Sequence, residues 1–136
     1  MTIPTKAHPT DACFDLYADI QNETGSLLIC PHQTVKVNTG FATNIPAGYW
    51  CPIYARSGLA SKQGLRPAQG VAVIDEPYTG EWLIPIHNDS EQVQEVRNGD
   101  RIAQFMLLPY FDTELIEVNE LDSTDRGDGG FGSTGK

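Results

Sequence analysis

Apolar and polar residues alternate with a period of two along much of this chain. Between Phe14 and Ile20 every second residue is apolar, and the acidic residues Asp15 and Asp19 lie between them. Such a period places the apolar side chains on one face of a β-strand. The same reasoning predicts further strands at 27–30, 34–38, 50–54, 71–74, 81–87, 93–96 and 101–108.

Turn-forming residues separate these segments at short intervals. The chain holds thirteen glycines and nine prolines, and turn sequences recur at 22–25, 38–40, 46–48, 79–80 and 98–100. Only one helix is predicted, a short one around 58–63. Many short strands with frequent turns are typical of an all-β barrel or sandwich.

The last fifteen residues have a different composition. From position 122 onwards Phe131 is the only apolar side chain, and five of the nine residues in 127–135 are glycine. Such a segment cannot bury enough apolar surface to offset its ordering entropy. We therefore expect a β-barrel domain at 1–121 and a flexible, glycine-rich arm at 122–136.

The end of this arm, GGFGSTGK, comes within one residue of the phosphate-binding pattern G-x-x-x-x-G-K-[ST]. A true P-loop lies between a buried strand and a helix. Residues 122–128, which precede this stretch, are too polar to form a buried strand, and no helix-forming sequence follows. We interpret the stretch as an arm that closes over a bound nucleotide, because its glycines let backbone N–H groups approach an anion.

Charge and cysteine content narrow the possible functions. The net charge of −9 over 136 residues disfavours general nucleic-acid binding. A phosphorylated small molecule would need a local cluster of the few basic residues, backbone N–H groups or a divalent ion. The three cysteines, Cys13, Cys30 and Cys51, have no metal or disulfide spacing and predict partly buried free thiols. Without an apolar span or signal sequence, we expect a cytoplasmic protein that binds no membrane.

Two stretches combine residue types suited to chemistry. Arg56, Ser57 and Gly58 precede the predicted helix and could bind an anion, although a Ser57 N-cap beside a solvated Arg56 is the simpler explanation of this stretch alone. Asp75 follows an apolar strand and could act as a general base, with Tyr78 packing beside a substrate. The alternative is a hairpin in which Asp75 only caps the turn.

Five ordered motifs strengthen these assignments, because together they resemble the trimeric deoxyuridine triphosphatase (dUTPase) family. The matching stretches are DACFDLYA at 11–18, ARSGLASKQG at 55–64, GVAVIDEPYTGE at 70–81, GDRIAQ at 99–104 and RGDGGFGSTG at 126–135. The resemblance implies a distorted, jelly-roll-like β-barrel that forms a homotrimer with shared active sites. It also implies hydrolysis of dUTP to dUMP and pyrophosphate, with Mg²⁺ on the triphosphate.

The resemblance implies a role for each matching residue. Asp75 would be the catalytic base, Tyr78 would pack under the deoxyribose, and Phe131 would stack on uracil. Asp15 would contact the metal indirectly, through water. The implied phosphate-binding residues are Arg56, Ser57, Gly58, Gln104, Arg126, Gly132, Ser133 and Thr134.

Three departures from the family pattern lie near the implied base site. Gln69 and Ala72 replace residues that members commonly carry there, and Pro77 stiffens the turn after the acid. They leave open a pyrophosphatase that accepts dCTP or a broader range of pyrimidine nucleotides. A non-catalytic module that binds a partner protein is the alternative of a different class.

Overall fold

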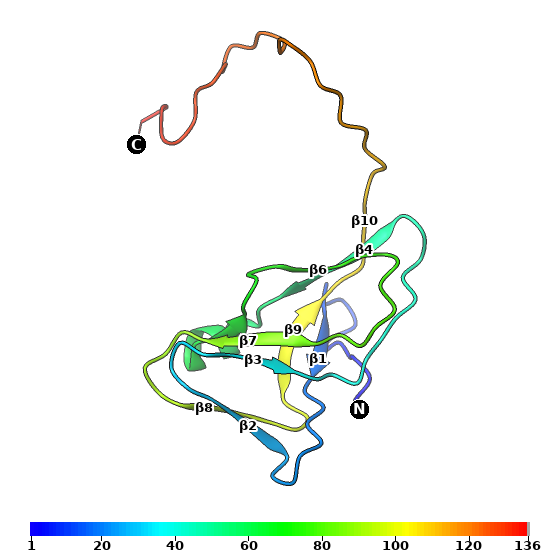
Figure 1. The fold of residues 1–136 in the computed structure, drawn as a ribbon, viewed down its shortest axis with the longest axis vertical. Helices are drawn as coiled ribbons and strands as arrows, with labels where there is room; N and C mark the ends of the chain where they lie inside the picture. Colours follow the sequence, from blue (N-terminus) through cyan, green and yellow to red (C-terminus); the bar gives the residue numbers. More distant parts are fainter. Residues whose placement is uncertain (136) are drawn as a thin grey trace.

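The computed structural model describes residues 1–135 and confirms the all-β class, with a jelly-roll-like β-barrel (Figure 1). Its strands are β1 (Phe14–Tyr17), β2 (Ser26–Ile29), β3 (Thr34–Val37), β4 (Tyr49–Tyr54), β5 (Leu65–Pro67), β6 (Ala72–Ile74), β7 (Ile84–Asn88), β8 (Gln94–Arg97), β9 (Arg101–Phe105) and β10 (Leu108–Pro109). One short helix of π type, η1 (Leu59–Gln63), connects β4 to β5 and ends at Gly64, whose φ of 68° favours glycine. Within residues 1–135 no helix has the length and hydrophobicity needed to cross a bilayer.

Three sheets form the barrel. The largest has the order β1-β9-β4-β10, and β6 pairs with the other edge of β4. The remaining sheets are β2-β8 and β3-β7-β5. Strand β4 is central to the largest sheet, because Ile53 pairs with Ala72 of β6 on one side and with Phe105 of β9 on the other. Leu108 of β10 continues the β9 edge and pairs with Trp50.

The structure differs from the expected strands in one pairing and in one additional strand. The segments 71–74 and 81–87 do not pair as a hairpin, because β6 belongs to the largest sheet and β7 pairs with β3 and β5. Strand β5 was not predicted, since it spans only three residues and includes Pro67. A short strand with a proline lacks both the length and the residue preferences of a typical strand.

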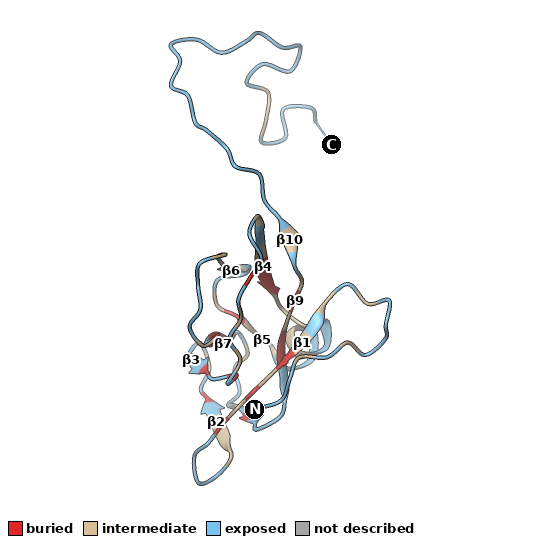
Figure 2. Ribbon diagram, turned by 90° about the vertical axis from the view of Figure 1, so that its right-hand side faces the viewer, coloured by how far each residue is buried: buried red, intermediate tan, exposed pale blue. Residues whose placement is uncertain are grey.

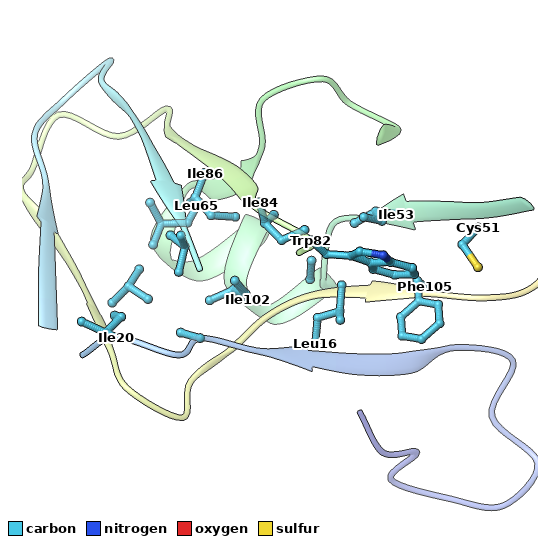
Figure 3. Packing of buried hydrophobic residues seen from close by; sticks show 14 of the residues in the cluster. Leu16, Ile20, Cys51, Ile53, Leu65, Trp82, Ile84, Ile86, Ile102 and Phe105 are labelled. Carbon is cyan, nitrogen blue, oxygen red and sulfur yellow. The ribbon is translucent and has the colours of Figure 1, made fainter. Parts of the chain in front are cut away.

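The core lies between the sheets and is built around Trp82 (Figures 2 and 3). Trp82 is completely buried and contacts the ring of Phe105 edge-on, at a centroid distance of 4.8 Å. Phe41 packs edge-on against the same indole at 5.1 Å. The predicted alternation along the first strand is confirmed at Leu16, Ala18 and Ile20, which are all buried.

All three cysteines are unpaired, as expected, although Cys30 is exposed and only Cys51 is buried. The chain leaves the barrel after Pro109 and runs away from it in both views (Figures 1 and 2). We call residues 110–135 the C-terminal segment. It contains no strand, and apolar side chains such as Phe111 and Leu115 are exposed there.

Candidate active site

Asp75 lies at the carboxyl end of β6, where the strand gives way to a turn. Its carbonyl oxygen accepts a hydrogen bond from the Tyr78 N–H at 3.0 Å, which closes the turn. Its side chain is exposed and makes no hydrogen bond to any other group of residues 1–135. The idea that this carboxylate caps the turn is therefore wrong, and the group is free to contact a ligand or a water molecule.

Tyr78 is held in place by the residues that follow it. Its hydroxyl donates a hydrogen bond to the carbonyl oxygen of Glu81 at 2.8 Å, and its ring lies over Gly80. A Cβ atom at position 80 would lie 2.7 Å from the hydroxyl oxygen and 2.8 Å from Cζ, which is closer than real contacts allow. Gly80 thus permits the position of the ring. Tyr78 and Asp75 border one small cavity of about 170 Å³, together with Trp82.

Glu76 lies next to Asp75 and makes contacts that the sequence did not predict. Its Oε2 accepts a hydrogen bond from the Tyr110 hydroxyl at 2.6 Å and another from the Gly48 N–H at 2.8 Å. These bonds, chiefly the one from Tyr110, lower the pKa of Glu76, and the same contact raises the pKa of Tyr110. Because the partners lie 34 positions apart, no local pattern could have linked them.

A second cluster forms around Asp15, beyond the far end of β4. The Nε atom of Arg56 donates a hydrogen bond to Asp15 Oδ1 at 2.7 Å, and Arg101 Nη1 lies 3.5 Å from Oδ2. Arg56 is therefore ion-paired and mostly covered, contrary to the simpler interpretation of that stretch as a solvated arginine. Gln104 pairs with Asp15 across β1 and β9, and its side-chain N–H donates to the Ala55 carbonyl oxygen at 2.8 Å.

Basic residues gather beside this cluster, as an anion site in an acidic chain requires. A cavity of about 320 Å³ is lined by Arg56, Lys62 and Arg101, with Gly58 at its edge and Asp100 as the only acidic lining residue. Lys62 was missed by the sequence analysis, although it belongs to the same short stretch of sequence as Arg56.

Ser57 does not cap the helix. Gly58 occupies the N-cap position and no side chain provides a cap hydrogen bond. The hydroxyl of Ser57 and the backbone N–H groups of this exposed loop are thus left available for an anion.

The two clusters lie at opposite ends of β4 within one chain. The register that pairs Cys51 with Ile74 places Asp75 beside Trp50, whereas Arg56 lies two residues beyond the last residue of the strand. Six residue steps along the chain, from position 50 to position 56 and mostly within β4, separate these positions by about 20 Å at the rise of an extended strand. A general base must lie within hydrogen-bond reach of the water it activates. One chain alone therefore cannot bring Asp75 to a phosphate held by its own Arg56.

The predicted residues of the C-terminal segment are not brought to either cluster. Phe131 is fully exposed, and Arg126 donates from Nε to the Gly129 carbonyl oxygen at 2.7 Å within the segment. Lys136 lies outside the described residues. Gln69 is exposed in the turn before β6. Ala72 is the first residue of β6 and pairs with Ile53 of β4. Both residues therefore precede Asp75 in the segment that leads to it.

Comparison with known proteins identifies the family and the fold. The family model described as dUTPase matches residues 1–135. The chain belongs to the dUTPase family. Among curated dUTPases it is similar to the deoxyuridine 5'-triphosphate nucleotidohydrolase of Desulfitobacterium hafniense, with 48% identity over 98% of this chain and 87% of the relative. The corresponding enzyme of Candida albicans is 39% identical over 98% of this chain and 81% of the relative.

Solved dUTPase structures share the arrangement of the barrel. A mutant of the dUTPase from Staphylococcus bacteriophage 80alpha with dUpNHpp superposes with a TM-score of 0.87 and 28% identity, covering 99% of this chain and 92% of the other. A mutant dUTPase from phage phi11 of S. aureus, described with a structural Mg(II) ion, gives a TM-score of 0.75 at 24% identity, over 90% of this chain and 92% of that one. The second likeness concerns the fold alone.

The side chains of this dUTPase suit a metal ion carried by a nucleotide better than a site built by protein. Residues 1–135 contain no group of three or more His, Cys, Asp or Glu side chains arranged to hold a cation. Asp15, the implied metal contact, already accepts a hydrogen bond from Arg56. Mg²⁺ commonly keeps several waters and is bound through substrate phosphates with one or two carboxylates. The free Asp75 carboxylate and the basic cavity fit that mode.

Proposed function

We propose that this protein hydrolyses dUTP to dUMP and pyrophosphate, as the names of its relatives describe for them. One observation carries the proposal. The Asp75 carboxylate is exposed at the end of a strand, makes no hydrogen bond within residues 1–135, and borders the same cavity as Tyr78. Asp75 orients and deprotonates the water that attacks the α-phosphorus. The Tyr78 ring packs under the deoxyribose and leaves no room for a 2′-hydroxyl.

The basic cluster supplies charge stabilisation for the triphosphate. Phosphoryl transfer depends mainly on positioning and on neutralising the oxygens that gain charge. Arg56, Ser57, Gly58 and Gln104 bind the phosphates in this proposal. Asp15 holds Arg56 at 2.7 Å, so the guanidinium is oriented before substrate arrives.

The active enzyme in this proposal is a homotrimer with shared sites. The separation of about 20 Å between Asp75 and Arg56 along β4 supports it, because a second copy of the chain must supply one of the two clusters. The exposed apolar residues of the C-terminal segment, among them Phe111, Leu115 and Leu121, also favour burial against another copy.

The glycine-rich arm at 122–136 completes the proposed site. Arg126, Gly132, Ser133 and Thr134 bind the phosphates, and Phe131 stacks on uracil when the arm closes. A bound Mg²⁺ would neutralise charge on the triphosphate, with Asp15 acting only through water. We place the protein in the cytoplasm, where its three unpaired thiols stay reduced.

Pyrophosphate release tests this function directly. We expect turnover of dUTP with Mg²⁺ to exceed that of dCTP, dTTP and UTP, and to fall when Mg²⁺ is removed. Faster turnover of dCTP would instead assign the base site to cytosine, through Gln69 and Ala72. The absence of release from all four nucleotides would contradict an enzymatic function and favour a partner-binding module.

A further inference from the structure

One carboxylate oxygen joins three segments of the chain at the end of the barrel. Glu76 Oε2 accepts hydrogen bonds from the Tyr110 hydroxyl at 2.6 Å and from the Gly48 N–H at 2.8 Å. Two of the three residues are also joined directly, because the Tyr110 N–H donates a hydrogen bond to the Gly48 carbonyl oxygen at 3.0 Å. We call Gly48, Glu76 and Tyr110 the Glu76 clasp.

Each member of the clasp marks the end of a strand. Gly48 comes directly before β4, Glu76 comes two residues after β6, and Tyr110 comes directly after β10. Strands β6 and β10 pair with opposite edges of β4, and all three meet where the C-terminal segment leaves the barrel (Figure 1). The clasp therefore bridges both edges of β4, around its first residue.

The clasp faces the same space as the proposed base. A cavity of about 540 Å³ is lined by Asp75, Glu76 and Tyr110, with Trp50, Val73 and Pro77 as its apolar part. Asp75 itself makes no side-chain hydrogen bond within residues 1–135. The position of Asp75 thus depends on the backbone of the turn. The side chain of the neighbouring Glu76 links this turn to Gly48, directly before β4, and to Tyr110, directly after β10.

Two backbone constraints hold the clasp in one geometry. Pro77 restricts the backbone of the residue before it, which is Glu76. Gly48 has a φ of 84°, a left-handed conformation that glycine adopts without steric cost. The donor and acceptor are thus prearranged, and a hydroxyl bound to an ionised carboxylate forms a strong, charge-assisted hydrogen bond.

We propose that Glu76 and Tyr110 are positioning residues for the hydrolysis, acting through the clasp on Asp75 and on the root of the C-terminal segment. This assignment rests on the proposed function. Tyr110 is the first residue of the C-terminal segment, which carries the fifth motif, so one hydrogen bond links the turn of the proposed base to the start of that segment. A displacement of about 1 Å in such a turn can slow catalysis roughly 10²-fold.

Three variants separate positioning from simple stability. Tyr110→Phe removes one hydroxyl, Glu76→Ala removes the acceptor, and Glu76→Gln keeps an acceptor oxygen. We expect Tyr110→Phe to lower kcat for dUTP about tenfold, the value of one lost hydrogen bond to a charged group. Glu76→Ala also loses the hydrogen bond from the Gly48 N–H and should lower kcat at least as much. KM should change by less than about twofold, Glu76→Gln should recover most of kcat, and the double variant should lose no more than Glu76→Ala alone.

Tyr49→Phe is the matched control. Tyr49 pairs with Pro109, is 39% exposed against 47% for Tyr110, and its hydroxyl makes no hydrogen bond within the described chain. Its kcat should equal that of the parent. Melting temperatures are recorded for every variant, so that a loss of folded protein is separated from a loss of turnover.

The kinetic results decide between clear outcomes. An active parent whose Tyr110→Phe and Glu76→Ala variants keep kcat within about twofold, or lose it only in proportion to folded protein, overturns the clasp assignment alone. Multiplying losses in the double variant overturn it too, because the two residues would then act independently. A parent that releases no pyrophosphate from dUTP overturns the proposed function and this assignment together.

Discussion

The guanidinium of Arg56 and the carboxylate of Asp15 form a 2.7 Å hydrogen-bonded ion pair between two segments that are 41 residues apart. Both side chains are largely buried, with 26% and 13% of their surfaces exposed. Arg101 approaches the second oxygen of the same carboxylate. One acid therefore orients two arginines beside the cavity proposed for the phosphates.

Asp15→Ala should weaken both the fold and nucleotide binding. It leaves two arginines without their acceptor, one of them partly buried, which costs about 1–3 kcal/mol of unfolding free energy. The urea midpoint measures this loss, and KM for dUTP should rise as Arg56 loses its orientation. Glu91→Ala breaks the exposed His32–Glu91 pair and should cost less than about 1 kcal/mol. Equal losses for the two variants would contradict a special role for Asp15.

Asp75→Asn should separate binding from turnover. The amide keeps the shape of the side chain but cannot accept the proton of the attacking water, so kcat should fall at least about 10²-fold. The affinity for dUpNHpp, measured by calorimetry, should stay close to that of the parent. A variant whose kcat falls by less than about tenfold would show that another group is the base.

Truncation after Ser123 should remove activity and leave the fold intact. The core residues lie before position 110, and the side chains from 124 to 135 are mostly exposed. We expect an unchanged melting temperature and oligomeric state, with little release of pyrophosphate from dUTP. Earlier melting of the truncated protein would show that the arm stabilises the barrel.

Trp82 should be the most costly core position. It is completely buried against Phe41 and Phe105, so Trp82→Ala should lower the unfolding free energy by about 3–5 kcal/mol. Its Nε1 atom is buried without a hydrogen-bond partner in residues 1–135. Trp82→Phe therefore loses no hydrogen bond and should cost clearly less in chemical denaturation. A Phe variant as unstable as the Ala variant would reveal a partner for the indole N–H.

Acid should destabilise the protein partly through Asp89. The hydrogen bond from Arg66 lowers the pKa of this carboxyl group, assisted by the charge of Arg66 and by His87 and His32. A lowered pKa in the folded state contributes stability above the ordinary pKa of about 4, and this contribution is lost as the pH falls through the lowered value. Asp89→Asn should therefore show a smaller drop in urea midpoint between pH 7 and pH 3. Glu117→Gln, a change in the exposed C-terminal segment, should leave that drop unaltered.

Local patterns predicted the parts of the fold that depend on local preferences. The alternation around Leu16 reflects what one face of a short segment can bury. The pairing of β6 with β4 could not be read in this way, because it depends on a partner about twenty residues earlier in the sequence. The closeness of 71–74 and 81–87 in the sequence suggested a hairpin between them. In the fold, β6 instead pairs with an edge of β4.

The site shows the same division. Asp75 and Tyr78, proposed here as the base and the sugar contact, could be singled out from the sequence, since a carboxylate after an apolar strand is a local feature. The hydrogen bond between Glu76 and Tyr110 crosses 34 positions, and the approach of Arg101 to Asp15 joins the first strand to the ninth. Such contacts exist only once the register of β1, β9 and β4 is set.

The close approach of Tyr78 to Gly80 makes the effect of a substitution at position 80 depend on the property that is measured. In a saturation library at position 80, most substitutions would leave a soluble barrel, because the loop is exposed and the ring can swing aside. If the ring is the gate against ribonucleotides, those soluble variants would begin to admit UTP. A screen for soluble expression would then accept most residues at position 80. A screen for discrimination between dUTP and UTP would accept only glycine.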